Sequence, residues 1–337
     1  MEVLTSAKSE TALSVGEKPT GSVPTGSVIV LGANGRLGQA CVAAFHAEGW
    51  NVAAFARSIP ETERLAHVNY VQGDALDPEI LARAVIGYDV IINAVNVPYG
   101  GWAGVTPKLT DAIARAAGST GATVIIPGNI YHYGAGMPVT LSEATDAAPT
   151  TELGKVRLTM ERAYQSRAVL EGFQALILRA GDYLDGRRTG GWFDSQIANK
   201  LPEGKVVYPG PLDMPHEWAY LPDFARAIVA LAGNRETLPA FKALGFSGHN
   251  ITGQQLKDGL TATIGQPLKL GGVPWAMLKM FSLFSPNLKG VTDMAYLWTK
   301  PHAIDGSAFD ALVQGFRRTP LATALSQACA QLAITKQ

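Results

Sequence analysis

Near its N-terminus the chain carries a glycine-rich loop between an apolar run and a stretch with helical spacing, an arrangement that few folds accommodate. The run at 27–31 leads directly into Gly-Ala-Asn-Gly-Arg-Leu-Gly at 32–38. The first glycine allows a tight turn, the second lets the backbone approach a diphosphate, and the third lets the helix pack closely on the strand. The helix N-terminus then faces the phosphates. We therefore expect dinucleotide contacts from Gly32, Asn34, Gly35, Arg36, Leu37 and Gly38.

Short apolar runs alternate with segments of helical spacing as far as Asp182. Such alternation is typical of βαβ units, whose right-handed crossovers put helices on both faces of a parallel sheet. The strand candidates are 27–32, 51–56, 68–73, 89–95, 122–128 and 174–180. The clearest helices are 36–48, 78–86, 106–117 and 153–171. The expected fold class is α/β, a doubly wound parallel sheet of the Rossmann type with a smaller C-terminal substrate lobe.

Composition divides the chain into three parts. Residues 1–26 are polar and lack the apolar run of a signal peptide, so we expect a disordered leader. Residues 27–181 are expected to form the dinucleotide-binding domain. Residues 182–337 become rich in Trp, Phe, Pro and Gly and should form mainly a substrate-binding lobe, with 205–232 returning to the Rossmann core.

The charges balance, with 28 Lys plus Arg against 28 Asp plus Glu, so no global field draws the chain to nucleic acid or to a membrane. A small-molecule substrate is the expected partner, and the sequence leaves the oligomeric state open, a homodimer included. Cys41 and Cys329 have the spacing of neither a metal site nor a redox pair, and no metal is expected. We interpret both as buried thiols of a cytoplasmic protein.

The choice of dinucleotide depends on the end of the second strand. An acidic residue there accepts hydrogen bonds from the ribose 2′-hydroxyl of NAD, but this chain has Ala56 followed by Arg57. A guanidinium suits a 2′-phosphate, so NADP is favoured, while NAD stays open because Arg57 also fits a solvated loop charge.

Four segments together resemble one enzyme family. They are the loop at 32–38, Gly-Asp-Ala-Leu-Asp at 73–77, the strand at 89–95, and Leu-Arg-Ala-Gly-Asp-Tyr-Leu-Asp-Gly at 178–186. This set resembles the extended or atypical short-chain dehydrogenase/reductases, which are NAD-dependent epimerase/dehydratase-like. The resemblance implies that Asp74 and Ala75 line the adenine and that Asn93 and Ala94 pass beneath the cofactor. It also implies a Tyr-x-x-x-Lys helix that supplies catalysis.

The chain departs from that family at the catalytic helix. Its well-placed lysine is Lys155, and Thr151 stands four residues earlier instead of tyrosine. Lys155 still suits the nicotinamide ribose, whereas a threonine is a poor acid. In Pro-Gly-Asn-Ile-Tyr-His-Tyr-Gly at 127–134 we prefer Tyr131 as the proton donor, with Asn129 polarising a carbonyl. The alternative is that Tyr131 only packs under the second lobe.

Further substrate contacts are expected from loops that follow the strands, because ligands bind beyond the carboxyl ends of such strands. They are Asn96, Tyr99, Trp102, Tyr183, Trp192 and Trp218, and for His216 we favour core packing. These aromatic side chains suggest a planar or partly apolar substrate.

Three functions fit these residues. The first is an NAD(P)-dependent oxidoreductase that moves a hydride between nicotinamide and a carbonyl or alcohol carbon. The second is an epimerase or dehydratase that uses NAD on a sugar nucleotide. The third is a non-catalytic NADP-binding sensor, which the missing tyrosine favours.

Overall fold

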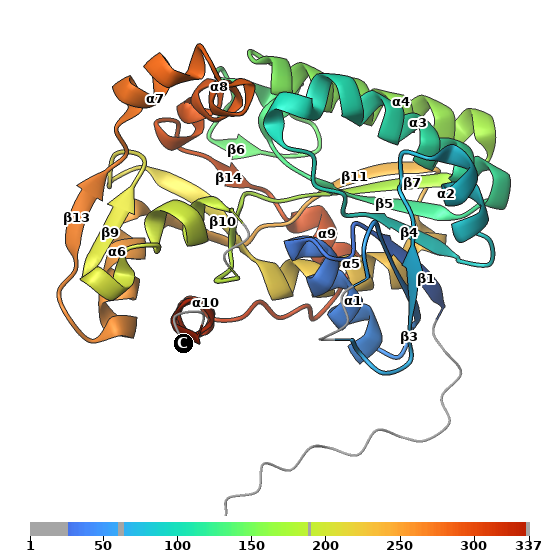
Figure 1. The fold of residues 1–337 in the computed structure, drawn as a ribbon, viewed down its shortest axis with the longest axis horizontal. Coiled ribbons are helices and arrows are strands. Elements are labelled where there is room, and N and C mark those ends of the chain that lie inside the picture. Colours follow the sequence, from blue (N-terminus) through green and yellow to red (C-terminus); the bar gives the residue numbers. More distant parts are fainter. Residues whose placement is uncertain (1–25, 60–63, 188–189, 335–337) are drawn as a thin grey trace, which may run out of the picture.

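The computed structural model describes residues 26–59, 64–187 and 190–334, so almost all of the expected leader lies outside the described residues. A seven-stranded parallel sheet forms the larger lobe, in the order β11-β7-β5-β4-β1-β2-β3 (Figure 1). The strands are β1 (Ser27–Leu31), β2 (Asn51–Ala56), β3 (Val68–Gln72), β4 (Val90–Asn93), β5 (Thr123–Gly128), β7 (Gln174–Arg179) and β11 (Phe241–Gly245). The first six match the expected strands. The seventh, β11, comes from the part of the chain assigned to the second lobe.

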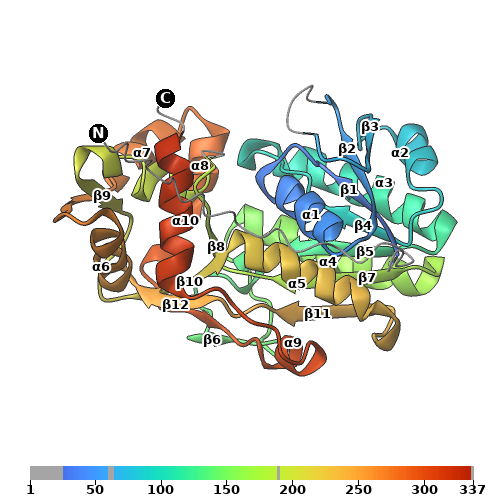
Figure 2. The same ribbon diagram turned by 90° about the horizontal axis from the view of Figure 1, so that it is seen from below.

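Helices cover both faces of this sheet (Figures 1 and 2). On one face lie α1 (Arg36–Ala47) and α5 (Leu221–Gly233), and on the other α2 (Pro78–Ala84), α3 (Trp102–Thr120) and α4 (Glu152–Glu171). Strand residues alternate between the two cores: Val28 and Val30 pack with α1 and α5, and Ile29 and Leu31 pack with α3 and α4. This confirms the doubly wound α/β fold.

The strand order reverses at β1, which pairs with β2 on one side and with β4 on the other. At such a switch point the loops after the two neighbouring strands run in opposite directions and leave a crevice. The crevice here lies beyond Leu31 of β1 and Asn93 of β4.

The second lobe has three small sheets. They are β12-β10-β8, β13-β9 and β14-β6, built from β6 (Thr140–Leu141), β8 (Asp182–Leu184), β9 (Lys205–Tyr208), β10 (Pro215–Tyr220), β12 (His249–Thr252), β13 (Lys269–Gly272) and β14 (Ala303–Ile304). Its helices are α6 (Gly253–Ile264), α7 (Trp275–Ser282), α8 (Pro286–Asp293) and α10 (Leu321–Ile334), while α9 (Ser307–Leu312) packs near β11. Of residues 205–232, α5 packs on the main sheet, whereas β9 and β10 belong to the second lobe.

Both cysteines are buried and unbridged. Among the described residues, no helix combines the length and the apolar character that crossing a bilayer requires.

Candidate active site

The glycine loop joins β1 to α1 as expected. Gly32 has a φ of +76°, and a Cβ there would lie 2.7 Å from the carbonyl oxygen of Ala94. A Cβ on Gly38 would lie 2.2 Å from the carbonyl oxygen of Gly32, so only glycine fits where helix and strand meet. No side chain of the described residues caps α1 at Gly35, which leaves its first amides free to donate to an anion. The loop therefore fits a dinucleotide diphosphate.

A cavity of about 450 Å³ opens beside this loop. Its wall combines the loop, the segment after β4, α3 and α4, and six of the expected cofactor residues lie in it: Asn34, Gly35, Arg36, Leu37, Asn93 and Ala94. We call it the cofactor-side cavity. Gly32 and Gly38 shape the turn without lining it.

The residues expected at the adenine end, Arg57, Asp74 and Ala75, follow β2 and β3 and do not line this cavity. Arg57 is exposed, and Asn34 ties its neighbour to the glycine loop, because Asn34 Nδ2 donates to the Ser58 carbonyl at 2.6 Å. Asp74 Oδ1 accepts a hydrogen bond from the Leu76 amide at 3.0 Å, and Ala75 is buried beside it. Their contacts with the adenosine half stay predictions.

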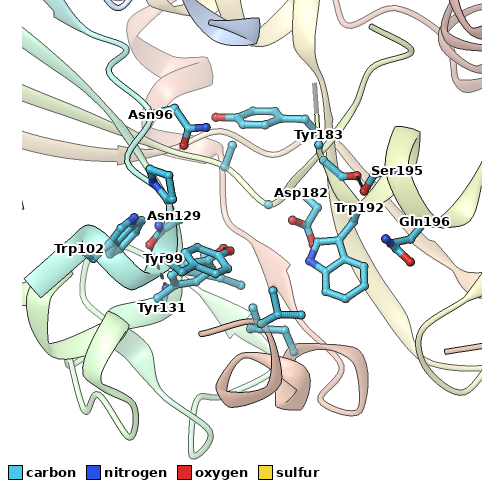
Figure 3. A pocket seen from close by; sticks show the side chains of 18 of the residues that line it. Asn96, Tyr99, Trp102, Asn129, Tyr131, Asp182, Tyr183, Trp192, Ser195 and Gln196 are labelled. Carbon is cyan, nitrogen blue, oxygen red and sulfur yellow. Dashed lines mark hydrogen bonds between the residues drawn. The ribbon is translucent and has the colours of Figure 1, made fainter. Parts of the chain in front are cut away.

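A second cavity of about 590 Å³ adjoins the first and reaches the second lobe (Figure 3). We call it the substrate-side cavity. Residues that line both cavities include Arg36, Asn96, Trp102, Arg157 and Tyr183. A ligand in one cavity therefore lies next to a ligand in the other.

Two tyrosine hydroxyls meet in the wall of the substrate-side cavity. Tyr131 Oη lies 2.7 Å from Tyr99 Oη, and the indole of Trp102 stacks on Tyr131. Tyr131 begins a 3-10 turn, Asn129 lines the same cavity, and its Oδ1 accepts from the Tyr131 amide at 3.2 Å. The structure thus brings Asn129, Tyr131, Tyr99 and Trp102 together in one cavity wall, and their catalytic and substrate-binding roles stay predictions.

The two hydroxyls keep their protons at neutral pH. Burial, together with the charge of Asp182, raises the pKa of Tyr99 to about 12, although the hydrogen bond shared with Tyr131 acts in the opposite direction. Burial and the neighbouring Tyr99 and Asp182 raise the pKa of Tyr131 well above its ordinary 10. Figure 3 shows Asp182 across the cavity from both tyrosines. At neutral pH both tyrosines are therefore in the hydroxyl form and can donate hydrogen bonds.

The catalytic helix presents a different cation from the one expected. Thr151 is the N-cap of α4 and accepts from the Gly154 amide at 3.1 Å. Lys155 is largely exposed, donates to Glu152 at 2.7 Å, and lines neither cavity, nor does Thr151. The structure therefore does not bring the expected Thr151 and Lys155 to the site.

Arg157, also on α4, does reach the site, because it lines both the cofactor-side and the substrate-side cavity. It is buried, with Nη2 donating to the Pro127 carbonyl at 2.6 Å and Nε to Glu161 at 3.1 Å. Glu161 also accepts from Arg179 at 2.6 Å. The family pattern predicts a lysine on this helix and therefore does not point to Arg157. The signal for Arg157 in the sequence is Glu161 four residues later, a spacing that favours an ion pair.

A second polar pair lies in the opposite wall. His216 Nε2 is 2.8 Å from Asp182 Oδ2, and the imidazole stacks flat on Trp298. His216 is buried, as expected, but it also lines the substrate-side cavity. Trp218 corrects another expectation, since it is wholly buried against Phe193 and lines neither cavity. Tyr183 and Trp192 do line the cavity.

Arg36 links the glycine loop to the second lobe. Its guanidinium lies over the ring of Tyr183 and 3.8 Å from the buried carboxylate of Asp194. At Gly191 a Cβ would lie 1.9 Å from Arg36 Nη1, so the second lobe closes tightly on this side chain. Arg36 is thus placed to contact both a cofactor diphosphate and the substrate-side cavity.

Comparison with known proteins agrees with this arrangement. The family model described as the NAD dependent epimerase/dehydratase family matches residues 28–244. The chain belongs to this family. This epimerase/dehydratase family member is therefore an NAD(P)-dependent enzyme, an oxidoreductase or an epimerase, as the resemblance implied.

Individual relatives of this family member differ in substrate. A dTDP-6-deoxy-L-talose 4-dehydrogenase (NAD(P)(+)) from Kitasatospora kifunensis is 25% identical over 269 residues, 73% of this chain and 82% of that protein. UDP-glucuronic acid 4-epimerase from Bacillus cereus, solved with UDP-glucuronic acid and NAD, gives a TM-score of 0.73 at 15% identity, over 92% of this chain and 99% of that one. L-threonine dehydrogenase from Phytophthora infestans gives 0.72 at 17% identity, over 92% and 99%. At these identities the two structures show the shared fold alone.

Proposed function

We propose that this family member is an NADP-preferring oxidoreductase that interconverts a carbonyl and an alcohol on a small, uncharged, partly apolar substrate. The observation that carries the proposal is the Tyr131–Tyr99 hydroxyl pair, 2.7 Å apart, in a cavity that adjoins the cofactor-side cavity. When bound, the reduced nicotinamide supplies a hydride. The chain must then bind the dinucleotide, orient the carbonyl and deliver one proton.

The glycine loop and two arginines would bind the dinucleotide. The free amides of α1 and the guanidinium of Arg36 would hold the diphosphate. Arg157 would take the role expected of Lys155, since it lines both cavities and adds positive charge between them. Its ion pair with Glu161 fixes the guanidinium in place.

Tyr131 and Tyr99 would deliver the proton. Tyr131 would donate its hydroxyl proton to the carbonyl oxygen while Tyr99 donates to the Tyr131 oxygen, which spreads the negative charge over two groups. Asn129 supports this step: its Oδ1 is held by the Tyr131 amide, so its Nδ2 remains for the same carbonyl oxygen.

The charges around the substrate-side cavity disfavour a sugar nucleotide. A substrate diphosphate needs cations of its own, but among the described residues the arginines that line this cavity have other roles: Arg36 would hold the cofactor diphosphate, and Arg157 is paired with Glu161. Asp182 adds a carboxylate to the wall, which would repel phosphate. An uncharged substrate needs no additional cation and is not repelled by the Asp182 carboxylate.

The test is a substrate screen on the purified chain. We expect NADPH absorbance to fall with at least one uncharged aldehyde, ketone or quinone, and to stay constant with UDP- and dTDP-sugars. Conversion of a nucleotide sugar would instead identify an epimerase or dehydratase. Tight NADP binding without turnover of any carbonyl compound would identify a sensor and overturn the proposal.

Cofactor preference can be tested at Arg57. Replacing it with alanine removes charge-assisted hydrogen bonds to a 2′-phosphate, so NADPH affinity should fall about tenfold or more while NADH affinity stays constant. Fluorescence titration of both nucleotides measures this. The control is Arg83→Ala on α2, whose exposed arginine pairs only loosely with Glu79 at 3.9 Å. Equal affinity of the parent protein for NADH and NADPH would contradict the preference.

A further inference from the structure

Asp182 and His216 form a polar pair in the wall of the substrate-side cavity that the proposed reaction does not use. Asp182 begins β8, and the parallel register sets it beside Trp218 of β10. His216 stands two positions before Trp218, so its side chain lies on the same face of the sheet. The pairing of the two strands therefore brings the carboxylate and the imidazole together.

The imidazole of His216 is held by packing and has one polar contact. It is 2% exposed and stacks on Trp298, with the two ring planes 2° apart. A carboxylate has no proton to donate, so His216 Nε2 donates to Asp182 Oδ2 at 2.8 Å. Within the described residues His216 Nδ1 has no hydrogen-bond partner. The polar role of this imidazole is therefore to orient the Asp182 carboxylate.

The other oxygen of this carboxylate, Asp182 Oδ1, is available to a ligand. The Asp182 side chain is 24% exposed and lines the cavity, and no donor in residues 26–59, 64–187 and 190–334 bonds to Oδ1. A ligand that fills the cavity removes water from this oxygen. Unless the ligand itself donates a hydrogen bond, Oδ1 is then left without a partner, which costs binding free energy.

The cavity is polar on two opposite sides. Figure 3 shows Asp182 on the side away from Tyr99 and Tyr131, whose hydroxyls lie 2.7 Å apart. Much of the remaining wall is apolar, with Leu278, Leu288, Val291 and Leu297 among its residues. A ligand that matches these walls has a hydrogen-bond acceptor on one side, a donor on the other and a carbon skeleton between them.

We propose that Asp182 Oδ1 accepts a hydrogen bond from a hydroxyl group of the substrate, which is therefore a hydroxylated aldehyde or ketone. This inference rests on the proposed carbonyl reduction and narrows its substrate class. The carbonyl oxygen would accept from Tyr131, and the hydroxyl would donate to Asp182 across the cavity. Asp182 would decide specificity, and His216 is a positioning residue that holds Oδ2 so that Oδ1 faces the ligand.

An ammonium group is a poorer donor for this site than a hydroxyl. Arg36 and Arg157 line the same cavity, and their guanidinium groups would repel a second cation. A hydroxyl satisfies the carboxylate without adding charge.

The experiment compares matched substrates in the parent and in two variants of Asp182. Cyclohexanone and butanone are tested against their monohydroxy and monoamino derivatives with NADPH. We expect the parent to reduce at least one hydroxylated member with a kcat/KM at least about tenfold above that of its unsubstituted ketone, since a hydrogen bond to a charged group has about this effect. Asp182→Leu should remove that preference without slowing the unsubstituted ketone.

The second variant, Asp182→Asn, covers the case in which Asp182→Leu does not fold. Its side-chain oxygen can still accept from His216 Nε2, so its melting temperature should match that of the parent. It turns an uncharged amide toward the ligand, so most of the preference for the hydroxylated ketone should disappear.

The role of His216 has its own readout. His216→Phe keeps a ring against Trp298 but removes the donor to Asp182, so it should lower kcat/KM for the hydroxylated ketone more than for the unsubstituted one. His216→Gln, whose amide nitrogen can donate to the same carboxylate, should restore much of the preference. A purely structural role would lower both rates alike.

The matched control is Asp185→Asn, three positions after Asp182. Asp185 is 3% exposed and lines neither cavity, so the preference for the hydroxylated ketone should remain. If the chain reduces no carbonyl compound, the proposed function fails, and calorimetric binding of cyclohexanol and the cyclohexanediols in the presence of NADP+ still decides the inference. No preference for any hydroxylated member in the parent would overturn the inference. So would a preference that both Asp182 variants retain, or a stronger preference for the amino derivatives.

Discussion

With Tyr131 replaced by phenylalanine, reduction of an identified carbonyl substrate should slow by about 10²–10⁴-fold, the usual contribution of a positioned general acid. The change removes one hydroxyl and leaves the ring stacked on Trp102, so KM and NADPH affinity should change little. Steady-state kinetics with NADPH absorbance measure both constants. Because its raised pKa keeps Tyr131 protonated, the parent's rate of reduction should stay level through neutral pH.

The control for this prediction is Tyr133→Phe in the same turn. Tyr133 donates to the Ser142 carbonyl at 3.2 Å and lines neither cavity, so its loss should cost about 1 kcal/mol of stability and leave the rate unchanged. Full activity in Tyr131→Phe would show that another group delivers the proton. The Asp182–His216 pair across the cavity would be the next candidate.

Replacing Glu161 with glutamine should lower the free energy of unfolding by about 3 kcal/mol or more, because it leaves Arg157 and Arg179 buried without their shared carboxylate. The variant should also bind NADPH more weakly, since Arg157 would lose the partner that orients it. Urea denaturation and nucleotide titration measure the two effects.

The same carboxylate predicts a pH dependence. Burial alone would raise the pKa of Glu161, but the charges of Arg157 and Arg179 outweigh it and hold that pKa below the ordinary 4.5. A depressed pKa contributes stability that is present above the unfolded value and lost as the pH falls through the folded value. The stability difference between the parent and Glu161→Gln should therefore be constant at neutral pH and shrink below pH 4.5.

The control is Glu171→Gln on the same helix. Glu171 pairs with Arg167 near the surface, where solvent screens the interaction, so its loss should cost less than about 1 kcal/mol. An equal loss of unfolding free energy in the two variants would show that burial does not make Glu161 more important for stability than Glu171.

Which residues reach the site depended on tertiary placement. Lys155 and Arg157 are two positions apart on α4, so a helix directs them about 200° apart. The packing of α4 on the sheet selects Arg157 for the cavities. Likewise His216 and Trp218 lie on the same face of β10, and only the former lines a cavity. The local spacing of these residues does not predict which member of each pair lines a cavity.

The amino-acid order alone determined the glycine loop, because strand, turn and helix there follow one another within about a dozen residues and local sterics decide their shape. It likewise predicted the parallel α/β fold, since its alternating pattern is a local property. The tertiary structure decided what the chain can do chemically. Tyr99 and Tyr131 lie far apart in sequence, as do Asp182 and His216, and their contacts exist only where separate loops converge at the ends of the strands.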